Sequence, residues 1–392
     1  MPVAELISAE WASSEAMLHS HAGAAQTYLP AGRAPRTGDV FRNPALAKTL
    51  REIGAHGRDA FYAGDVARRI LALSAQLDGA LVASDLADFT AERVAPLSTT
   101  YRGWTVSELP PNGQGISALM MLNILEHFPI GEYGHNSVAA LHTLIEAKKL
   151  AYADMRRHLA DTRFSQVPVS ALLSKEYGRE RARLIDTWRA RNDVDAGGLP
   201  EHGGDTTYLT AVDRDGNMVS LIQSNFANFG SGLVPEGLGF ALQNRGGLFS
   251  LEHGHPNVLA PRKRPLHTII PGFMSRGPTR IAFGIMGGWN QSQAHAQFVS
   301  NVVDHGMNIQ AALEAPRFTK LTFEGCDVTI EDRVPVATRV ALGLKGHEIA
   351  VQGAYSSMVG GGQSVMREGA AGVNYGASDP RKDGAAIPEP NL

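Results

Sequence analysis

The sequence changes character near residue 190, and this change constrains the fold more than any other feature. Residues 1–190 carry the apolar periodicities of helices, whereas residues 206–392 are dominated by short strand-like runs. Residues 191–205 fall in the polar, glycine-rich run RARNDVDAGGLPEHGGD, which lacks periodicity and is typical of a flexible connector. Helices, then strands, then further helices predict an α+β fold around a mainly antiparallel sheet.

Local patterns predict the individual elements of this fold. In the first half, Val66, Ile70 and Leu73 recur at helical spacing, with Asp65 placed as the N-cap of that helix. A longer helix over 138–159 carries a single apolar stripe. The predicted strands occupy 207–213, 218–224, 238–243, 267–274, 280–286 and 328–332, and helices follow them in SQAHAQFVSNVVDHG and IQAALEAPRF.

Composition narrows the class of protein. The chain has 392 residues, 43% hydrophobic and 19% charged, with a net charge of −3, which indicates a soluble globular protein of one large domain or two packed domains. This balance gives no electrostatic reason to expect a nucleic-acid or membrane partner. The single cysteine, Cys326, excludes an intrachain disulfide. Without a recognisable signal peptide, the expected location is cytoplasmic, and a periplasmic or secreted location stays open if the N-terminus is truncated.

Most familiar site motifs are absent from the sequence. There is no Walker loop, G-x-G-x-x-G fingerprint, H-E-x-x-H pair or G-x-S-x-G elbow. The run EHGHP brings Glu252, His253 and His255 together, but no third ligand follows at metal spacing, so a polar loop is the preferred interpretation. The glycines of 360–363 predict a tight turn with positive φ. No metal or organic cofactor is therefore expected.

The stretch Asp205-Thr206-Thr207 has two interpretations. Spacing alone favours the simpler one, in which both threonines are β-branched residues that open a strand. A threonine hydroxyl is a weak nucleophile that needs a base within hydrogen-bond reach. If the chain were cut before Thr206, its new α-amino group would lie beside its own hydroxyl and would titrate at about 7.7–8.0, which suits a general base. The connector meets the strand at this junction, so a cut there costs little.

The surrounding motifs resemble the γ-glutamyltransferase (glutathione hydrolase) family. The small-subunit motifs are TTYLTAVDRDGNMV, FGSGLVPEGLGFALQN, KRPLHTIIPGF and GIMGG, followed by GMNIQAALEAPRF and NYGASDPRKDGAA. The large-subunit motifs are NPALAKTLREIGAHGRDAFYAGDVA, YRGWTVSELPPNGQG, LNILE and AKKLAYADMRRHLAD. They follow one another in the family's order across nearly the whole chain.

This resemblance implies an N-terminal-nucleophile (Ntn) hydrolase, a four-layer αββα sandwich made as one precursor. Residues 1–190 would be part of the large subunit, 191–205 the connector, and 206–392 the small subunit. The hydroxyl of Thr206 would attack the Asp205 carbonyl, and an N-to-O acyl shift followed by water would free the new N-terminus. The same hydroxyl would then attack a substrate amide and form an acyl-enzyme that water or an amine resolves.

Further roles follow from the resemblance, position by position. Gly287 and Gly288 match the glycine pair whose N–H groups form the oxyanion hole. Ser224 falls where the family places a threonine beside the nucleophile. Thr268 falls on the second of two serines that hold the substrate α-carboxylate, and His267 replaces the first.

Three substitutions depart from the pattern of family members that bind a γ-glutamyl group. Phe226, Arg245 and Leu248 stand where those members have an asparagine, a glutamine and an aspartate. Leucine offers no partner for a buried ammonium, whereas an arginine suits a carboxylate. The chain therefore resembles the acylase-leaning and glutathione-hydrolase-like branch of the family, for which dicarboxylic acyl amides are candidate substrates.

Family precursors also carry a sizeable segment ahead of the position of residue 1, so an incomplete sandwich is expected. Three functions stay open at this point: hydrolysis of γ-glutamyl amides, a cephalosporin-acylase-like activity on glutaryl amides, and an inactive fragment or binding remnant. The expected partners are a small amide substrate, a water or amine acceptor, and the two subunits derived from the chain itself.

Overall fold

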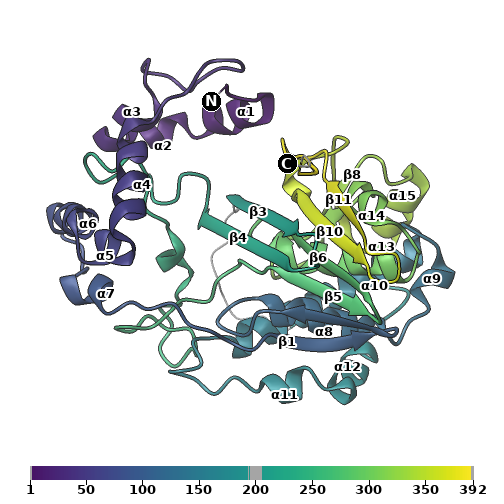
Figure 1. The fold of residues 1–392 in the computed structure, drawn as a ribbon. Coiled ribbons are helices and arrows are strands. Elements are labelled where there is room, and N and C mark those ends of the chain that lie inside the picture. The colour runs from purple at the N-terminus through teal and green to yellow at the C-terminus, as the bar shows by residue number, and fades with distance from the viewer. Residues whose placement is uncertain (1, 193, 195–204, 390–392) are drawn as a thin grey trace. The chain divides into compact units, whose positions relative to one another are not determined.

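The computed structural model describes residues 2–192, 194 and 205–389, which form two compact units. One unit comprises Met1–Arg93 and Asn225–Arg245, and the other comprises Val94–Ser224 and Gly246–Leu392 (Figure 1). The predicted boundaries at residues 190 and 205 describe the subunits that a cut would produce, not compact units of the fold, so they stay a prediction. Connector residues 193 and 195–204 lie outside the described residues.

The first unit is helical. Its helices are α1 (Glu5–Ser13), α2 (Glu15–His19), α3 (Ala22–Tyr28), α4 (Pro44–His56), α5 (Arg58–Tyr62), α6 (Asp65–Gln76) and α7 (Ala83–Ala87). Trp11, Leu18 and Leu29 from the early helices form a buried core with Val234 and Ala241 of the later segment. Burial of apolar surface therefore joins two parts of the chain that are distant in sequence.

The strand predicted over 238–243 is wrong. These residues are irregular, because several of their backbone groups bond to side chains of α3 and α4, and Leu242 bonds to the backbone of Ser231 and Leu233. The Thr49 hydroxyl donates to the Leu238 carbonyl at 2.9 Å, and the Ala241 N–H donates to the Tyr28 hydroxyl at 3.0 Å. The chain also passes close to α4 at Gly239, where a Cβ atom would lie 2.3 Å from a backbone nitrogen.

The helix predicted around residue 70 is present, but its N-cap prediction is wrong. Val66, Ile70 and Leu73 are buried in α6, as the periodicity predicts. The N-cap residue is Gly64, and Asp65 lies in the first helical turn without capping it. The Asp65 carboxylate accepts from Arg69 at 2.7 Å, a pairing four residues apart along the helix surface.

The second unit contains the sheet. Its strands are β1 (Leu97–Tyr101), β2 (Trp104–Glu108), β3 (Asp205–Val212), β4 (Met218–Phe226), β5 (Gly272–Arg276), β6 (Thr279–Ile285), β7 (Phe318–Thr319), β8 (Asp327–Glu331), β9 (Glu348–Gln352), β10 (Gly362–Glu368) and β11 (Val373–Ser378). Its helices are α8 (Gly115–Leu125), α9 (Ile130–Tyr133), α10 (Val138–His158), α11 (Val169–Leu172), α12 (Lys175–Ala182), α13 (Asn290–Val303), α14 (Ile309–Glu314) and α15 (Val336–Leu344), with 3-10 turns η1 (Arg245–Leu248) and η2 (Ser357–Val359). The predicted α+β class is confirmed.

A six-stranded antiparallel sheet forms the centre of this unit, in the order β1-β2-β5-β6-β10-β11. Its two faces are covered by different layers, as Figure 1 shows. Phe283 of β6 stacks on Phe298 of α13 at 4.8 Å between ring centroids. A Cβ atom at the next residue, Gly284, would meet the ring of Tyr208 in β3 at 2.4 Å. Successive strand residues point to opposite faces, so α13 covers one face and the β3–β4 hairpin the other.

The strand predicted over 267–274 is shorter than expected. β5 begins at Gly272, and the preceding loop bonds to the turn before α8. His267 N–H donates to the Asn112 carbonyl at 3.1 Å, and Gln114 N–H donates to the His267 carbonyl at 3.1 Å. The loop is therefore held by a turn that is distant in sequence.

Helix α10 differs from the predicted amphipathic helix. Residues 140–156 are buried all round, and they include Glu146, Lys148 and Lys149. The helix packs between α8 and α15, so no face of its centre is left for solvent. The two buried lysines have polar partners: Lys149 donates to Glu146 at 2.7 Å, and Lys148 donates to the Thr322 carbonyl at 2.7 Å.

Among the described residues, no helix combines the length and the apolar character that crossing a membrane requires.

Candidate active site

The threonine pair is divided between the two faces of the β3–β4 hairpin. Thr206 is 4% exposed and points toward the central sheet, as Tyr208 does, whereas Thr207 lies on the outer, exposed face with Leu209. The alternation follows from the pleat of a strand. The Thr206 hydroxyl donates a hydrogen bond to the Ser224 hydroxyl on β4 at 3.2 Å, which fixes its direction. Of the two threonines, only Thr206 has an enclosed, oriented hydroxyl.

Strand β3 crosses the central sheet so that its first residues, including Thr206, lie near the C-terminal end of β6, just before the glycine pair. Tyr208 lies over Gly284. At the hairpin turn, Gly216 lies against Arg367, whose partner across the sheet is Arg280. Moving along β3 from the turn toward its start therefore follows β6 from residue 280 toward residue 287. Thr206 lies two residues beyond Tyr208 in that direction.

Gly287 and Gly288 form a sharp bend between β6 and α13. Their φ angles are 123° and 58°, in the left-handed region that glycine adopts without strain. Asn290 N–H donates to the Gly287 carbonyl at 2.9 Å, and Gln291 N–H donates to the Gly288 carbonyl at 3.2 Å. Within the described part of the chain, the N–H groups of the two glycines donate to no acceptor. These N–H groups lie at the start of a 14-residue helix, whose dipole favours a negative charge.

The two residues predicted to hold the substrate carboxylate lie in the loop before β5. Thr268 is fully buried, and His267 is half-buried against Gly113. The side chain of Gln114 reaches this loop and donates to the Thr268 carbonyl at 2.7 Å. The sequence patterns did not single out Gln114 as a site residue. The one signal that could have singled it out is its place in the motif PPNGQG, which belongs to the resemblance.

Two of the three substituted positions, Arg245 and Leu248, are the first and last residues of η1. Phe226 and Arg245 belong to the first unit, where the guanidinium of Arg245 lies 5.5 Å from the centroid of the Phe226 ring. Phe226 has a φ of 80°, an unusual backbone conformation for a bulky residue. Burial lowers the pKa of Arg245 to about 10. Leu248, in the second unit, is fully buried and contributes no charge.

The predicted polar loop with Glu252, His253 and His255 is not a metal-binding group in the structure. Glu252 and His253 are exposed, and His255 Nδ1 accepts from the Asn257 N–H at 3.0 Å. Among the described residues, a different set has metal-like spacing: His142, Glu146 and His347, whose candidate ligand atoms lie within 4.8 Å of one another.

Hydrogen bonds already occupy the ligand atoms of that set. His142 Nε2 donates to the Asp186 carbonyl at 2.7 Å, so in a neutral ring its Nδ1 accepts from His347 Nε2 at 2.8 Å. Glu146 accepts from Lys149 at 2.7 Å and from the Arg191 N–H at 3.2 Å. A cation bound by these three residues would have to break these hydrogen bonds and would lie beside Lys149. We therefore interpret the set as a polar network that holds the chain before the connector.

This network predicts a pH dependence of stability. Burial lowers the pKa of His347 from 6.5 to about 3, so the folded protein keeps the ring neutral where the unfolded chain protonates it. The contribution to stability is complete above pH 6.5 and is lost as the pH falls toward 3, by about 1.4 kcal/mol per pH unit. Urea unfolding at pH 7, 6 and 5 measures this slope. His347→Gln, which retains an N–H donor, should flatten the slope, and an unchanged slope would contradict the assignment.

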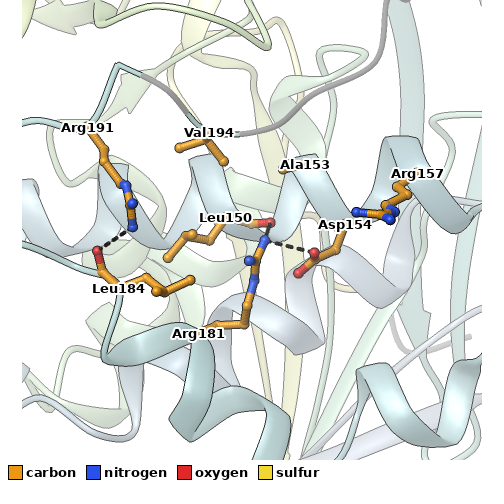
Figure 2. Close-up of a pocket in the computed structure, with 8 residues that line it drawn as sticks. All are labelled: Leu150, Ala153, Asp154, Arg157, Arg181, Leu184, Arg191 and Val194. Carbon is orange, nitrogen blue, oxygen red and sulfur yellow. Dashed lines mark hydrogen bonds and ion pairs between the residues drawn. The ribbon is translucent and has the colours of Figure 1, made fainter.

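A cavity of about 220 Å³ lies beside this network, between α10, α12 and the chain near Val194 (Figure 2). Arg181 crosses it to bond Asp154 at 2.8 Å and the Leu150 carbonyl at 3.1 Å. Arg191 donates to the Leu184 carbonyl at 3.0 Å. None of the predicted active-site residues lines this cavity.

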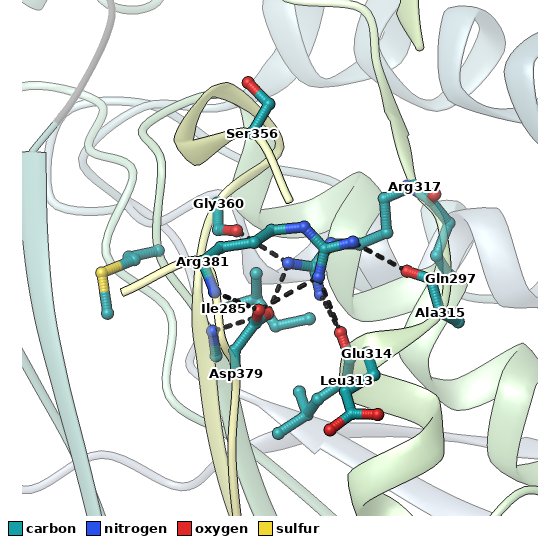
Figure 3. A network of polar contacts seen from close by, with 12 residues as sticks. Ile285, Gln297, Leu313, Glu314, Ala315, Arg317, Ser356, Gly360, Asp379 and Arg381 are labelled. Carbon is teal, nitrogen blue, oxygen red and sulfur yellow. Dashed lines mark hydrogen bonds and ion pairs between the residues drawn. The ribbon is translucent and has the colours of Figure 1, made fainter. Parts of the chain in front are cut away.

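A buried ionic network lies beside Gly360, with Arg317, Asp379 and Arg381 at its centre (Figure 3). Arg381 donates to Glu331 at 2.8 and 2.6 Å and to Asp379 at 3.0 Å, and Arg317 donates to Asp379 at 2.5 Å. Arg317 also donates to the Gly360 carbonyl at 2.7 Å. The turn predicted from the glycines of 360–363 begins at Gly360, which has a positive φ of 76°.

The turn also contacts the strand that leads to the glycine pair. Met286 N–H donates to the Gly361 carbonyl at 3.0 Å. A Cβ atom at Gly360 would lie 2.1 Å from the Met286 carbonyl. The network therefore supports the backbone that ends at Gly287.

Comparison with known proteins gives this geometry its context. A sequence model of gamma-glutamyltranspeptidase matches residues 1–389. The chain belongs to the γ-glutamyltranspeptidase family. The glutathione hydrolase-like YwrD proenzyme of Bacillus subtilis is 36% identical to it over 372 residues, which cover 93% of this chain and 69% of that protein. The glutathione hydrolase proenzyme of Escherichia coli is 34% identical, over 93% of this chain and 64% of that protein.

Among solved structures, a cephalosporin acylase from Bacillus halodurans has a TM-score of 0.90 to this chain at 40% identity. The match covers 98% of this chain and 71% of the acylase. The chain thus spans roughly two thirds of the length of these relatives. Members of the γ-glutamyltranspeptidase family are hydrolases and acyltransferases made as proenzymes, so the predicted family, enzyme class and Ntn-hydrolase fold are confirmed.

Proposed function

We propose that this chain is an autoprocessing amidohydrolase in which Thr206 is the nucleophile for self-cleavage and for turnover. The observation that carries the proposal is the enclosed Thr206 hydroxyl, which bonds to Ser224 at 3.2 Å near the start of β3, where β3 lies over the end of β6 that precedes the glycine pair. Its substrates are γ-glutamyl amides or related acyl amides. Neither step requires a metal or an organic cofactor.

Self-cleavage begins when Thr206 Oγ1 attacks the carbonyl carbon of Asp205. The C–N bond of that peptide breaks as an ester forms, and the Thr206 nitrogen becomes a free amine. Water then hydrolyses the ester, which leaves the Asp205 carboxylate and restores the threonine hydroxyl. The net change is the addition of one water, divided between two chains.

Turnover uses the same hydroxyl, and the base is the new α-amino group. The free α-amino group of Thr206 accepts the hydroxyl proton while the oxygen attacks the substrate amide carbonyl. The N–H groups of Gly287 and Gly288 donate to the developing oxyanion, a contribution that is typically about 3–4 kcal/mol for a single donor. The amine product leaves, and water or a second amine releases the acyl group from the threonine.

A second candidate substrate class is supported by the substituted positions. Leu248 is fully buried and provides no partner for an ammonium group, whereas Arg245 is a buried cation that suits a carboxylate. The family resemblance assigns both positions to substrate binding, and an acyl group with a distal carboxylate and no ammonium, such as glutaryl, suits these two residue types. The similarity to a cephalosporin acylase at 40% identity supports the same class.

Intact mass measured against time after purification tests the proposal. We expect two fragments, 1–205 and 206–392, whose masses sum to the precursor plus one water. Turnover is then measured with γ-glutamyl and glutaryl anilides side by side, and the ratio of rates distinguishes the two substrate classes. A single stable mass without hydrolysis of either anilide would reject the proposal in favour of an inactive fragment or binding remnant.

A further inference from the structure

Gln114 connects two loops of the candidate active site through one amide group. It is fully buried in the turn before α8. Its Nε2 donates to the Thr268 carbonyl at 2.7 Å and to the Gly288 carbonyl at 2.8 Å. A side-chain amide has two N–H groups, so each carbonyl takes one. The opposite orientation of the amide would place an oxygen against two carbonyl oxygens, so the assignment of nitrogen and oxygen is determined by the acceptors.

The backbone of Gln114 is held as firmly as its side chain. Its N–H donates to the His267 carbonyl at 3.1 Å, and its own carbonyl accepts from the Ser292 hydroxyl at 3.0 Å. Ser292 belongs to the first turn of α13, directly after the glycine pair. The backbone of Gln114 is therefore attached to the loop before β5 and to the first turn of α13.

These bonds fix the peptide groups on both sides of Gly288. A carbonyl and the following N–H share one planar peptide. Asn290 holds the Gly287 carbonyl at 2.9 Å, which sets the direction of the Gly288 N–H. Gln114 holds the Gly288 carbonyl, which restrains the same glycine from its other side. With a φ of 58° and no side chain, Gly288 has many alternative conformations if one restraint is lost.

We propose that Gln114 is a positioning residue that sets the distance between the oxyanion donors and the acyl-binding loop. This inference rests on the proposed function, in which Gly288 stabilises the oxyanion, and on the predicted contact of Thr268 with the substrate carboxylate. Gln114 touches neither the substrate nor the reacting atoms. Because it spans both loops, its loss should reduce the rate and also alter discrimination between acyl groups of different length.

Gln114→Met provides the test, because it removes both N–H donors and nearly retains the volume of the side chain. We expect kcat/KM for the glutaryl anilide to fall about 10²-fold, the cost of a misplaced reacting geometry. We also expect the rate ratio between the glutaryl and adipoyl anilides to change. Rates are normalised to the amount of cleaved chain, and the rate of self-cleavage is recorded separately by intact mass.

Gln297→Met is the matched control. Gln297 is also a buried glutamine, and it lies on α13 away from the glycine pair. Its Nε2 donates to the carbonyls of Gln293 and Phe318, both at 3.1 Å. It should lower the Tm without changing the acyl-length ratio. If the ratio of glutaryl to adipoyl rates is the same in wild type and in both variants, the inference about Gln114 is overturned. Activity of the wild type would in that case still support the proposed function. An uncut, inactive wild-type chain would overturn both.

Discussion

Thr206→Ala should leave the chain uncut and reduce hydrolysis of both anilides by about 10⁴-fold or more, because a single hydroxyl is the nucleophile in both reactions. The structure encloses this hydroxyl on the inner face of β3, where it bonds to Ser224. Intact mass reports the cut, and initial rates report turnover. Cleavage between Asp205 and Thr206 in the variant, or full activity, would reject the mechanism.

Thr207→Ala is the control for this experiment. Thr207 is the neighbouring threonine of the same strand, but its side chain lies on the exposed outer face. Its removal should therefore affect neither cleavage nor turnover by more than a few-fold. Thr206→Ser, which keeps a hydroxyl and an α-amine, should still cut itself. Together the three variants separate the hydroxyl of residue 206 from general disturbance of the strand.

Arg381→Met should reduce the free energy of unfolding by about 3–5 kcal/mol, because it removes a buried cation that Glu331 and Asp379 share and leaves each carboxylate with a single arginine partner, Arg333 or Arg317. Arg381 is 1% exposed, and its guanidinium contacts Glu331 and Asp379 together with the carbonyls of Leu313 and Ala315 at 2.9 Å. Urea unfolding in the Thr206→Ala background measures this loss on a single uncut chain.

Arg179→Met is the matched control for the ionic network. Arg179 pairs with Glu176 at 3.5 Å on α12, and both side chains are more than half exposed. An exposed pair of this kind contributes about 0–1 kcal/mol, so the variant should unfold almost as the parent does. Similar losses in the two variants would contradict the role assigned to the buried network.

Several features of this protein could be predicted because they depend on neighbouring residues. The helical periodicity of Val66, Ile70 and Leu73 correctly predicts their burial in α6. The strands predicted over 207–213 and 218–224 are present as β3 and β4. The strand predicted over 238–243 failed for a reason outside its own sequence, since its backbone groups bond to Thr49 and Tyr28 instead of to a strand.

Motifs in the sequence alone were sufficient to determine the family, the α+β class and the candidate junction at Asp205-Thr206, because each is written in contiguous residues. The tertiary structure alone decided that Thr206 faces the central sheet while Thr207 faces outward, and that Gln114 joins Thr268 to Gly288. The hydrogen bond from Gln114 to Gly288 links residues 174 positions apart. Periodicity and spacing describe only neighbours along the chain, whereas the register of packed layers selects which distant groups meet.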